Sequence, residues 1–190
     1  MSAVAELTSR QELVLDGLND YYIDSGGHGT EAFNEKTACI MEAFCLVLGY
    51  DPHNLPDGDH VYLTPPCVSE EIATFFIEIN DAIFDDDVRA KLKPLAVMIL
   101  NTAPTYKKGK KTFKKKSSRD YKRAEKQRES LLYEFFGTSK EKLGWSVPSP
   151  ELRRLILTES GNLRYAKLKK FIQQLVDVGK FENGELVENV

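Results

Sequence analysis

The chain has 190 residues, of which 42% are hydrophobic and 29% are charged, and its formal net charge is −3. This composition is typical of a globular protein and excludes a disordered or fibrous chain. The sequence contains no apolar run near the roughly 20 residues that a membrane-spanning helix needs and no signal-peptide pattern at its start, so we expect a cytoplasmic protein without membrane contact.

Residues 1–100 carry 18 Asp and Glu against 5 Lys and Arg, and the spacing of their apolar residues predicts helices. Each expected helix follows residues that cap a helix N-terminus: Thr8 or Ser9, Thr30 or Asn34, Ser69, and Asp85-Asp86-Asp87. The second helix is apolar from Thr37 to Leu48 except at Glu42, which predicts a buried helix at the centre of a core. Several prolines in 49–68 predict an irregular connection to the third helix.

Residues 101–190 carry 21 Lys and Arg against 11 Asp and Glu, so this half is basic. Residues 103–118 combine seven lysines with no apolar periodicity, which predicts a flexible basic connector. Ser117 or Ser118 then caps a helix expected over about 119–136. Its apolar face holds Tyr121, Ala124, Leu131, Leu132 and Phe135, and its opposite face holds Arg119, Lys122, Arg123 and Lys126.

The C-terminal part predicts a short helix over about 151–158, a tight turn and a longer helix over about 163–178. Asn183-Gly184 between two short runs predicts a β-hairpin, because a type I′ turn needs positive φ at both central residues. We therefore expect a mainly α fold, in which a helical bundle lobe is joined to a small helical lobe closed by the C-terminal β-hairpin. The two domains are expected at 1–102 and 119–190, on either side of the basic connector.

The order of short helix, tight turn, longer helix and hairpin within 119–190 resembles a winged helix-turn-helix module. Residues 163–187 carry most of the resemblance, from Leu168-Lys169-Lys170-Phe171-Ile172 to the Asn-Gly turn. In that family the second helix of the pair enters the DNA major groove. The resemblance therefore implies groove contacts at Lys167, Lys170 and Gln173. Many winged helices serve only in protein interactions, and a plain helical domain closed by a hairpin is the structural alternative.

The Lys-rich segment predicts sequence-independent attraction to phosphates. Residues 103–128 hold twelve Lys and Arg against two carboxylates, and each cation that neutralises a phosphate releases a counterion. The expected phosphate contacts are Lys107, Lys108, Lys110, Lys111, Lys114, Lys115, Lys116, Arg119, Lys122, Arg123 and Lys126. Tyr106, Phe113 and Tyr121 lie among them and are candidates for stacking on unpaired bases. The alternatives are a solvated linker and a strap that binds the acidic half of the same chain.

Glu42 lies on an otherwise apolar helix, where a carboxylate must be paired, hydrogen-bonded or protonated. Cys39, Glu42, His60 and Cys67 are the weak candidates for a metal site or a thiol enzyme. Because the sequence has no Cys-x-x-Cys or His-Glu-x-x-His spacing, we expect no metal or other cofactor. The favoured interpretation is that Cys39 and Cys45 are small core residues and that Glu42 binds backbone amides or a loop side chain.

A second resemblance covers residues 35–101, through Cys39-Ile40-Met41-Glu42-Ala43, Pro66-Cys67-Val68 and Asn80-Asp81-Ala82. These runs are similar to small uncharacterised proteins of bacteriophages and actinobacteria, a resemblance that implies no known reaction. The leading prediction is a non-enzymatic nucleic-acid-binding protein that uses a Lys-rich arm and a basic amphipathic helix. One alternative is a phage-type regulator or inhibitor that binds a host protein through the acidic lobe, and the other is the metal or thiol enzyme.

Overall fold

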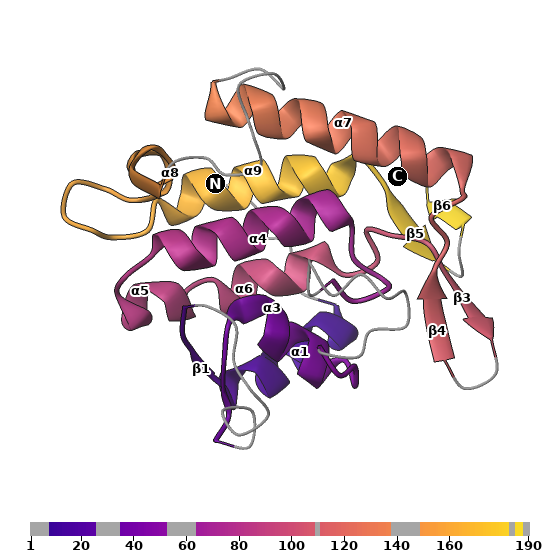
Figure 1. The fold of residues 1–190 in the computed structure, drawn as a ribbon, viewed down its shortest axis with the longest axis horizontal. Helices are drawn as coiled ribbons and strands as arrows, with labels where there is room; N and C mark the ends of the chain where they lie inside the picture. The colour runs from indigo at the N-terminus through magenta and orange to yellow at the C-terminus, as the bar shows by residue number, and fades with distance from the viewer. Residues whose placement is uncertain are drawn as a thin grey trace.

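The structure is a computed structural model, and it describes residues 8–25, 35–52, 64–108, 111–137, 149–182 and 185–187. Within these ranges the protein is mainly helical, as the sequence predicts (Figure 1). The helices are α1 (Ser9–Asn19), α3 (Ile40–Val47), α4 (Glu70–Ala82), α5 (Asp86–Ala90), α6 (Lys93–Ala96), the 3₁₀ helix η1 (Val97–Ile99), α7 (Arg119–Phe136), α8 (Ser149–Ile156) and α9 (Tyr165–Asp177). The strands are β1 (Tyr22–Ile23), β2 (Thr37–Ala38), β3 (Thr105–Lys108), β4 (Lys111–Lys114), β5 (Lys180–Glu182) and β6 (Glu185–Val187).

Helix starts follow the predicted capping residues at four places. Thr8 and Gln11 form the capping box of α1, with the Gln11 amide donating to Thr8 Oγ1 at 3.3 Å. The side chains of Ser69, Asp85 and Ser118 accept a backbone N–H in the first turn of α4, α5 and α7. Each cap satisfies a donor that the helix itself leaves unpaired.

The second helix begins later than the sequence predicts. Thr37 and Ala38 form β2, which pairs in parallel with β1, and Cys39 caps the eight-residue helix α3. Thr30 and Asn34, the two residues predicted to cap this helix, lie outside the described residues. The helix is buried as expected, since each residue from Ile40 to Cys45 has less than a tenth of its surface exposed to solvent.

The larger of two hydrophobic clusters runs through the described part of the chain, from Val14 on α1 to Val176 on α9, and a smaller one joins Ala103, Tyr121, Ala124 and Phe181. In the view of Figure 1, α7, α9, α4 and α6 follow one another from top to bottom, with α1 and α3 beyond α6, and α4 contacts both α9 and α7. Phe75 on α4 joins these layers, because its ring contacts Phe135 on α7 at 5.9 Å and Phe171 on α9 at 5.5 Å between centroids. The core is therefore continuous across the expected boundary between 1–102 and 119–190.

The expected flexible connector at 103–118 contains a β-hairpin. Strands β3 and β4 pair antiparallel, with Thr105 opposite Lys114 and Tyr106 opposite Phe113. The prediction of a flexible connector was wrong for two reasons. Lysines occupy positions where a strand usually shows alternating apolar and polar residues, and the hydrogen bonds between strands join backbone groups, which need no apolar side chain. In Figure 1 this hairpin projects from the end of the helix array.

The C-terminal part has the predicted order of α8, a turn, α9 and a hairpin of β5 and β6. Leu157 and Leu163 form an antiparallel bridge across the turn between the two helices. The buried stripe of α9 is the predicted one, with Leu168, Phe171 and Ile172 each below a tenth exposed. Through Phe171, α9 packs against Phe135 on α7 and Phe75 on α4.

Candidate nucleic-acid interface

Helix α7 presents a basic face to solvent along its first half. Arg119, Lys122, Arg123 and Lys126 are all exposed, as the sequence predicts. Arg123 lies 3.9 Å from the exposed carboxylate of Asp120, a weak surface pair. Within the part of the chain that the structure describes, the other three side chains make no hydrogen bond or ion pair. These charges are therefore available to an external anion.

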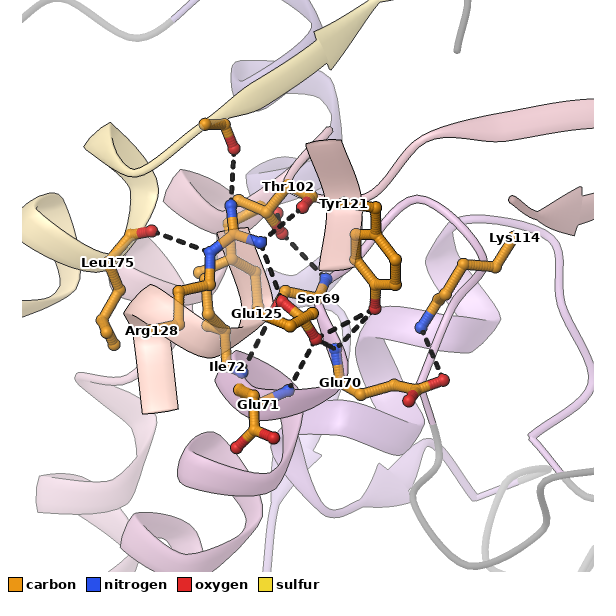
Figure 2. A network of polar contacts seen from close by, with 12 residues as sticks. Ser69, Glu70, Glu71, Ile72, Thr102, Lys114, Tyr121, Glu125, Arg128 and Leu175 are labelled. Atoms are coloured by element: carbon orange, nitrogen blue, oxygen red, sulfur yellow. Dashed lines mark hydrogen bonds and ion pairs between the residues drawn. The ribbon is translucent and has the colours of Figure 1, made fainter. Parts of the chain in front are cut away.

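The opposite face of α7 carries an arginine that the apolar pattern did not predict. Arg128 is fully buried, and its guanidinium donates to three backbone carbonyls. These are Leu175 O at 3.0 Å, Thr102 O at 2.9 Å and Gly179 O at 2.5 Å. It also donates to Glu125 Oε1 at 2.8 Å. Arg128 thereby ties α7 to the end of α9 and to the segment after η1 (Figure 2).

Glu125 completes this network by binding the N-terminus of α4 (Figure 2). Its carboxylate accepts hydrogen bonds from the backbone amides of Glu70 at 3.0 Å and Glu71 at 3.3 Å. It also accepts the hydroxyls of Ser69 at 2.6 Å and Tyr121 at 2.9 Å. A carboxylate at this point satisfies amides that the helix leaves free and complements the helix dipole.

The network changes the assignment of Tyr121, which the sequence offered as a base-stacking residue. The residue is 3% exposed, and its hydroxyl donates to Glu125. Burial, with the nearby carboxylates of Glu125 and Glu70, raises the pKa of this phenol above its usual value. Tyr121 is therefore a structural residue that helps to hold the buried face of α7.

Lys114 is another predicted phosphate contact that the structure places in the interior. The residue is 5% exposed, and its Nζ lies 3.5 Å from Glu70 Oε1. Burial lowers the pKa of its ammonium group, while Glu70 acts in the opposite direction. Lys116 Nζ also binds Glu70 Oε1, at 2.7 Å. Two lysines of the basic segment thus pair with the acidic half, as the strap interpretation predicts.

Among the described residues, the remaining lysines of the Lys-rich segment lie at different places in or beside the β3–β4 hairpin. Lys115 is exposed, at the base of the hairpin. Lys107, Lys108 and Lys111 belong to the strands. Lys110 lies outside the described residues.

On α9, the predicted groove contacts Lys167 and Lys170 are exposed, and Gln173 is half-buried. The amide of Gln173 donates to Asp177 Oδ1 at 2.6 Å, so it is already engaged. Lys167 Nζ lies 5.2 Å from the ring centroid of Phe135 on α7. The exposed face of α9 therefore adjoins α7.

A surface pocket lies between α7 and α9. Arg123 and Lys126 contribute cations to its lining, and Glu134 and Asp177 contribute carboxylates. Because the charges are mixed, the pocket is less favourable to phosphates than the basic first half of α7.

Two residues of the candidate metal or thiol site, Cys39 and Glu42, form the capping box of α3. Glu42 accepts the Cys39 backbone N–H at 2.8 Å, and its own amide donates to Cys39 Sγ at 3.4 Å. Glu42 thus binds a backbone amide, as the favoured interpretation predicts. Among the residues that the structure describes, no group of three or more acidic, His or Cys side chains is arranged to hold a metal. Cys67 is also buried, and His60 lies outside the described ranges.

Sequence reasoning missed the charged residues inside the core, although one signal was present. Tyr121, Ala124, Arg128 and Leu132 follow the spacing of a buried helix face, so an arginine interrupts an apolar stripe. The partner of such an arginine comes from distant backbone, which a helical pattern does not specify. Arg89 is a second case, since it is 2% exposed and donates to Asn80 O at 3.2 Å and to Asp86.

The chain matches no protein-family model, no curated protein and no solved structure at a significant level. The winged-helix and phage-protein resemblances therefore stay predictions. None of the described helices combines the length and apolar character needed to cross a bilayer.

Proposed function

We propose that this protein binds nucleic acid, without enzymatic activity, through the basic first half of α7. The observation that carries this proposal is the exposed row of Arg119, Lys122, Arg123 and Lys126 on a helix whose other face is anchored in the core. Counterion release from phosphates supplies the affinity and makes it independent of base sequence.

The buried network supports this function by fixing α7 in place. Arg128 and Glu125 bind backbone groups of three other segments, so the exposed cations are held in one arrangement. A preorganised cation row loses less conformational entropy on binding than a mobile arm does. At a rise of about 1.5 Å per residue, the row from Arg119 to Lys126 is about 10 Å long, which matches about three phosphates of one strand.

The residue types also suit phosphate recognition. Arg119 and Arg123 carry planar guanidinium groups that bind phosphate oxygens in pairs, whereas Lys122 and Lys126 act as point charges. None of these groups reads a base edge by itself when it binds phosphate. Lys167 and Lys170 on α9 are the residues through which a winged-helix mode would add groove contacts.

The test is a set of binding isotherms at several salt concentrations. The change is Arg119→Gln, Lys122→Gln, Arg123→Gln and Lys126→Gln in one variant. Each lost phosphate contact reduces the slope of log K against log salt by about 0.7 to 0.9, and the row matches about three phosphates, so we expect the slope to flatten by about 2 to 3. Fluorescence anisotropy with labelled DNA measures it.

The matched control is Lys91→Gln, which removes an exposed lysine from the acidic part of the chain. We expect this control to bind as the wild type does. Wild-type binding whose strength ignores salt, or a quadruple variant with an unchanged slope, would contradict the proposal. Circular dichroism checks that the variants keep their helical content.

A second candidate function is protein interaction through the acidic part. Phe84 is 73% exposed, next to Asp85 at the start of α5, and Arg153 packs over its ring at 3.2 Å. In Figure 1, α5 lies at the opposite end of the molecule from the β3–β4 hairpin. A single protein that is captured after nuclease treatment by the wild type, but not by Phe84→Ala, would favour this function.

A further inference from the structure

The two faces of the β3–β4 hairpin are formed by different sets of residues. Cross-strand partners share a face of a sheet, and neighbours along a strand alternate between faces. The register pairs Tyr106 with Phe113 and Lys108 with Lys111, two positions apart along each strand. These four positions therefore share one face, which we call the aromatic face. The other face holds Thr105, Lys107, Thr112 and Lys114.

The protein body determines which face of the hairpin is available. Lys114, on the opposite face, is 5% exposed and lies against Glu70. Tyr106, on the aromatic face, is 48% exposed. The hairpin itself projects from the helix array (Figure 1). At Tyr106 the aromatic face is thus turned away from the body.

An exposed aromatic ring in this segment is unusual for the molecule. Among the described residues, the large apolar side chains with high exposure are Leu13, Tyr22, Phe84 and Tyr106. Tyr106 is the member of this set that belongs to the Lys-rich segment. Lys107 follows it in the sequence, and Lys115 and Arg119 are exposed where β4 leads into α7.

We propose that the aromatic face of the hairpin is a binding platform for single-stranded nucleic acid, with an unpaired base stacked on Tyr106. This inference rests on the proposed function and specifies its ligand. A base in a duplex is already stacked on its neighbours and offers only its edges in the grooves. A base in a single strand offers its face, and aromatic rings next to cations are the usual platform for it.

The geometry of the platform suits a short stretch of strand. Each hairpin strand has four residues, which is about 13 Å at 3.3 Å per residue. Phe113 is the register partner of Tyr106 and gives the platform its second aromatic residue, and Lys108 pairs with Lys111 two positions further along each strand.

The experiment compares a labelled oligothymidylate of about 20 nucleotides with a duplex of the same length, at about 50 mM salt. We expect the wild type to bind the single strand more tightly. Tyr106→Ala and Phe113→Ala should each weaken single-strand binding by roughly 5- to 150-fold, the range for loss of one stacked base. Tyr106→Phe keeps the ring and should bind as the wild type does.

Two further readouts separate stacking from a general loss of structure or charge. The alanine variants should leave the salt slope unchanged, whereas Lys108→Gln with Lys111→Gln should flatten it by about 1.4 for a single strand. Phe84→Ala removes a more exposed ring at the other end of the molecule and should not change affinity. Urea unfolding midpoints verify that the hairpin variants fold.

The outcomes also separate this inference from the proposed function. If the duplex binds as tightly as the single strand, or if Tyr106→Ala and Phe113→Ala bind like the wild type, the platform is wrong and the cation row of α7 stands alone. If the wild type binds neither probe, the proposed function fails with it.

Discussion

Replacing Arg128 by Met tests whether the buried network holds α7 against the rest of the fold. Methionine retains an apolar chain of similar length and removes every donor. The substitution leaves Glu125 without its cation and removes the donor to the carbonyls of Thr102, Leu175 and Gly179. All of these contacts lie at the junction of α7 with the end of α9 and the start of α4 (Figure 2).

The expected cost follows from the loss of one partner of a buried ion pair, which is about 3–5 kcal/mol. Unpaired carbonyls add to this cost where water does not reach them. The total is a large part of the 5–15 kcal/mol that typically stabilises a domain. With an m-value of about 2 kcal/mol/M in urea, the unfolding midpoint should fall by about 1.5–2.5 M.

The assay is urea unfolding followed by circular dichroism at 222 nm, with Arg123→Met as the matched control. Arg123 is exposed on the same helix and pairs only weakly with Asp120, so its loss should cost less than about 0.5 kcal/mol. A midpoint for Arg128→Met within about 0.5 M of the wild type would refute the role assigned to this network. A double-mutant cycle with Glu125→Gln then isolates the direct pair.

Two other predictions concern buried ionisable groups. Burial raises the pKa of the Cys39, Cys45 and Cys67 thiols, so a thiol reagent at pH 8 should modify none of them in the native protein and all of them in denaturant. Because the unfolded chain loses these protons first, unfolding free energy should fall as pH rises above about 8.5. Burial lowers the pKa of Lys114. This group therefore makes the unfolding free energy rise with pH, up to about pH 10.4, the pKa of a lysine in the unfolded chain. Lys114→Met should therefore make the unfolding free energy fall more steeply at alkaline pH and leave DNA affinity unchanged. Lys115→Gln, in contrast, should lower DNA affinity. Reactive native thiols, or a loss of affinity in Lys114→Met without unfolding, would contradict these assignments.

Local signals in the sequence predicted local structure well. Thr8, Ser69, Asp85 and Ser118 cap helices because a side-chain oxygen three residues from a free amide acts at short range. The apolar stripe of α9 is likewise confirmed. The exposed basic face of α7 follows from the same spacing rule, since a helix that buries one side exposes the other.

What the sequence did not show depends on contacts between distant segments. The β3–β4 hairpin is stabilised by backbone pairing, and its lysines hide the alternation of a strand. The burial of Lys114 depends on Glu70, 44 residues away. Arg128 binds carbonyls 26, 47 and 51 residues away in sequence. The apolar spacing of α7 places Arg128 on a buried helix face but does not indicate its partners. For Lys114, no local pattern distinguishes it from a lysine that faces solvent.

These internal pairs alter what the charge of the basic segment means for binding. Of the twelve cations in residues 103–128, Lys114, Lys116 and Arg128 pair with Glu70 or Glu125. At most nine therefore remain to release counterions. At about 0.7 per phosphate for a single strand, this segment should contribute no more than about 6 to the size of the slope of log K against log salt, whereas twelve free cations would contribute about 8. A slope near −8 in a variant that lacks Lys167 and Lys170 would mean that the carboxylates release their lysines and arginine on binding, and that the segment acts as the flexible arm suggested by its composition. A slope of −6 or shallower agrees with an interface in which the acidic half keeps part of the basic segment engaged, so that α7 and the hairpin act as a rigid surface.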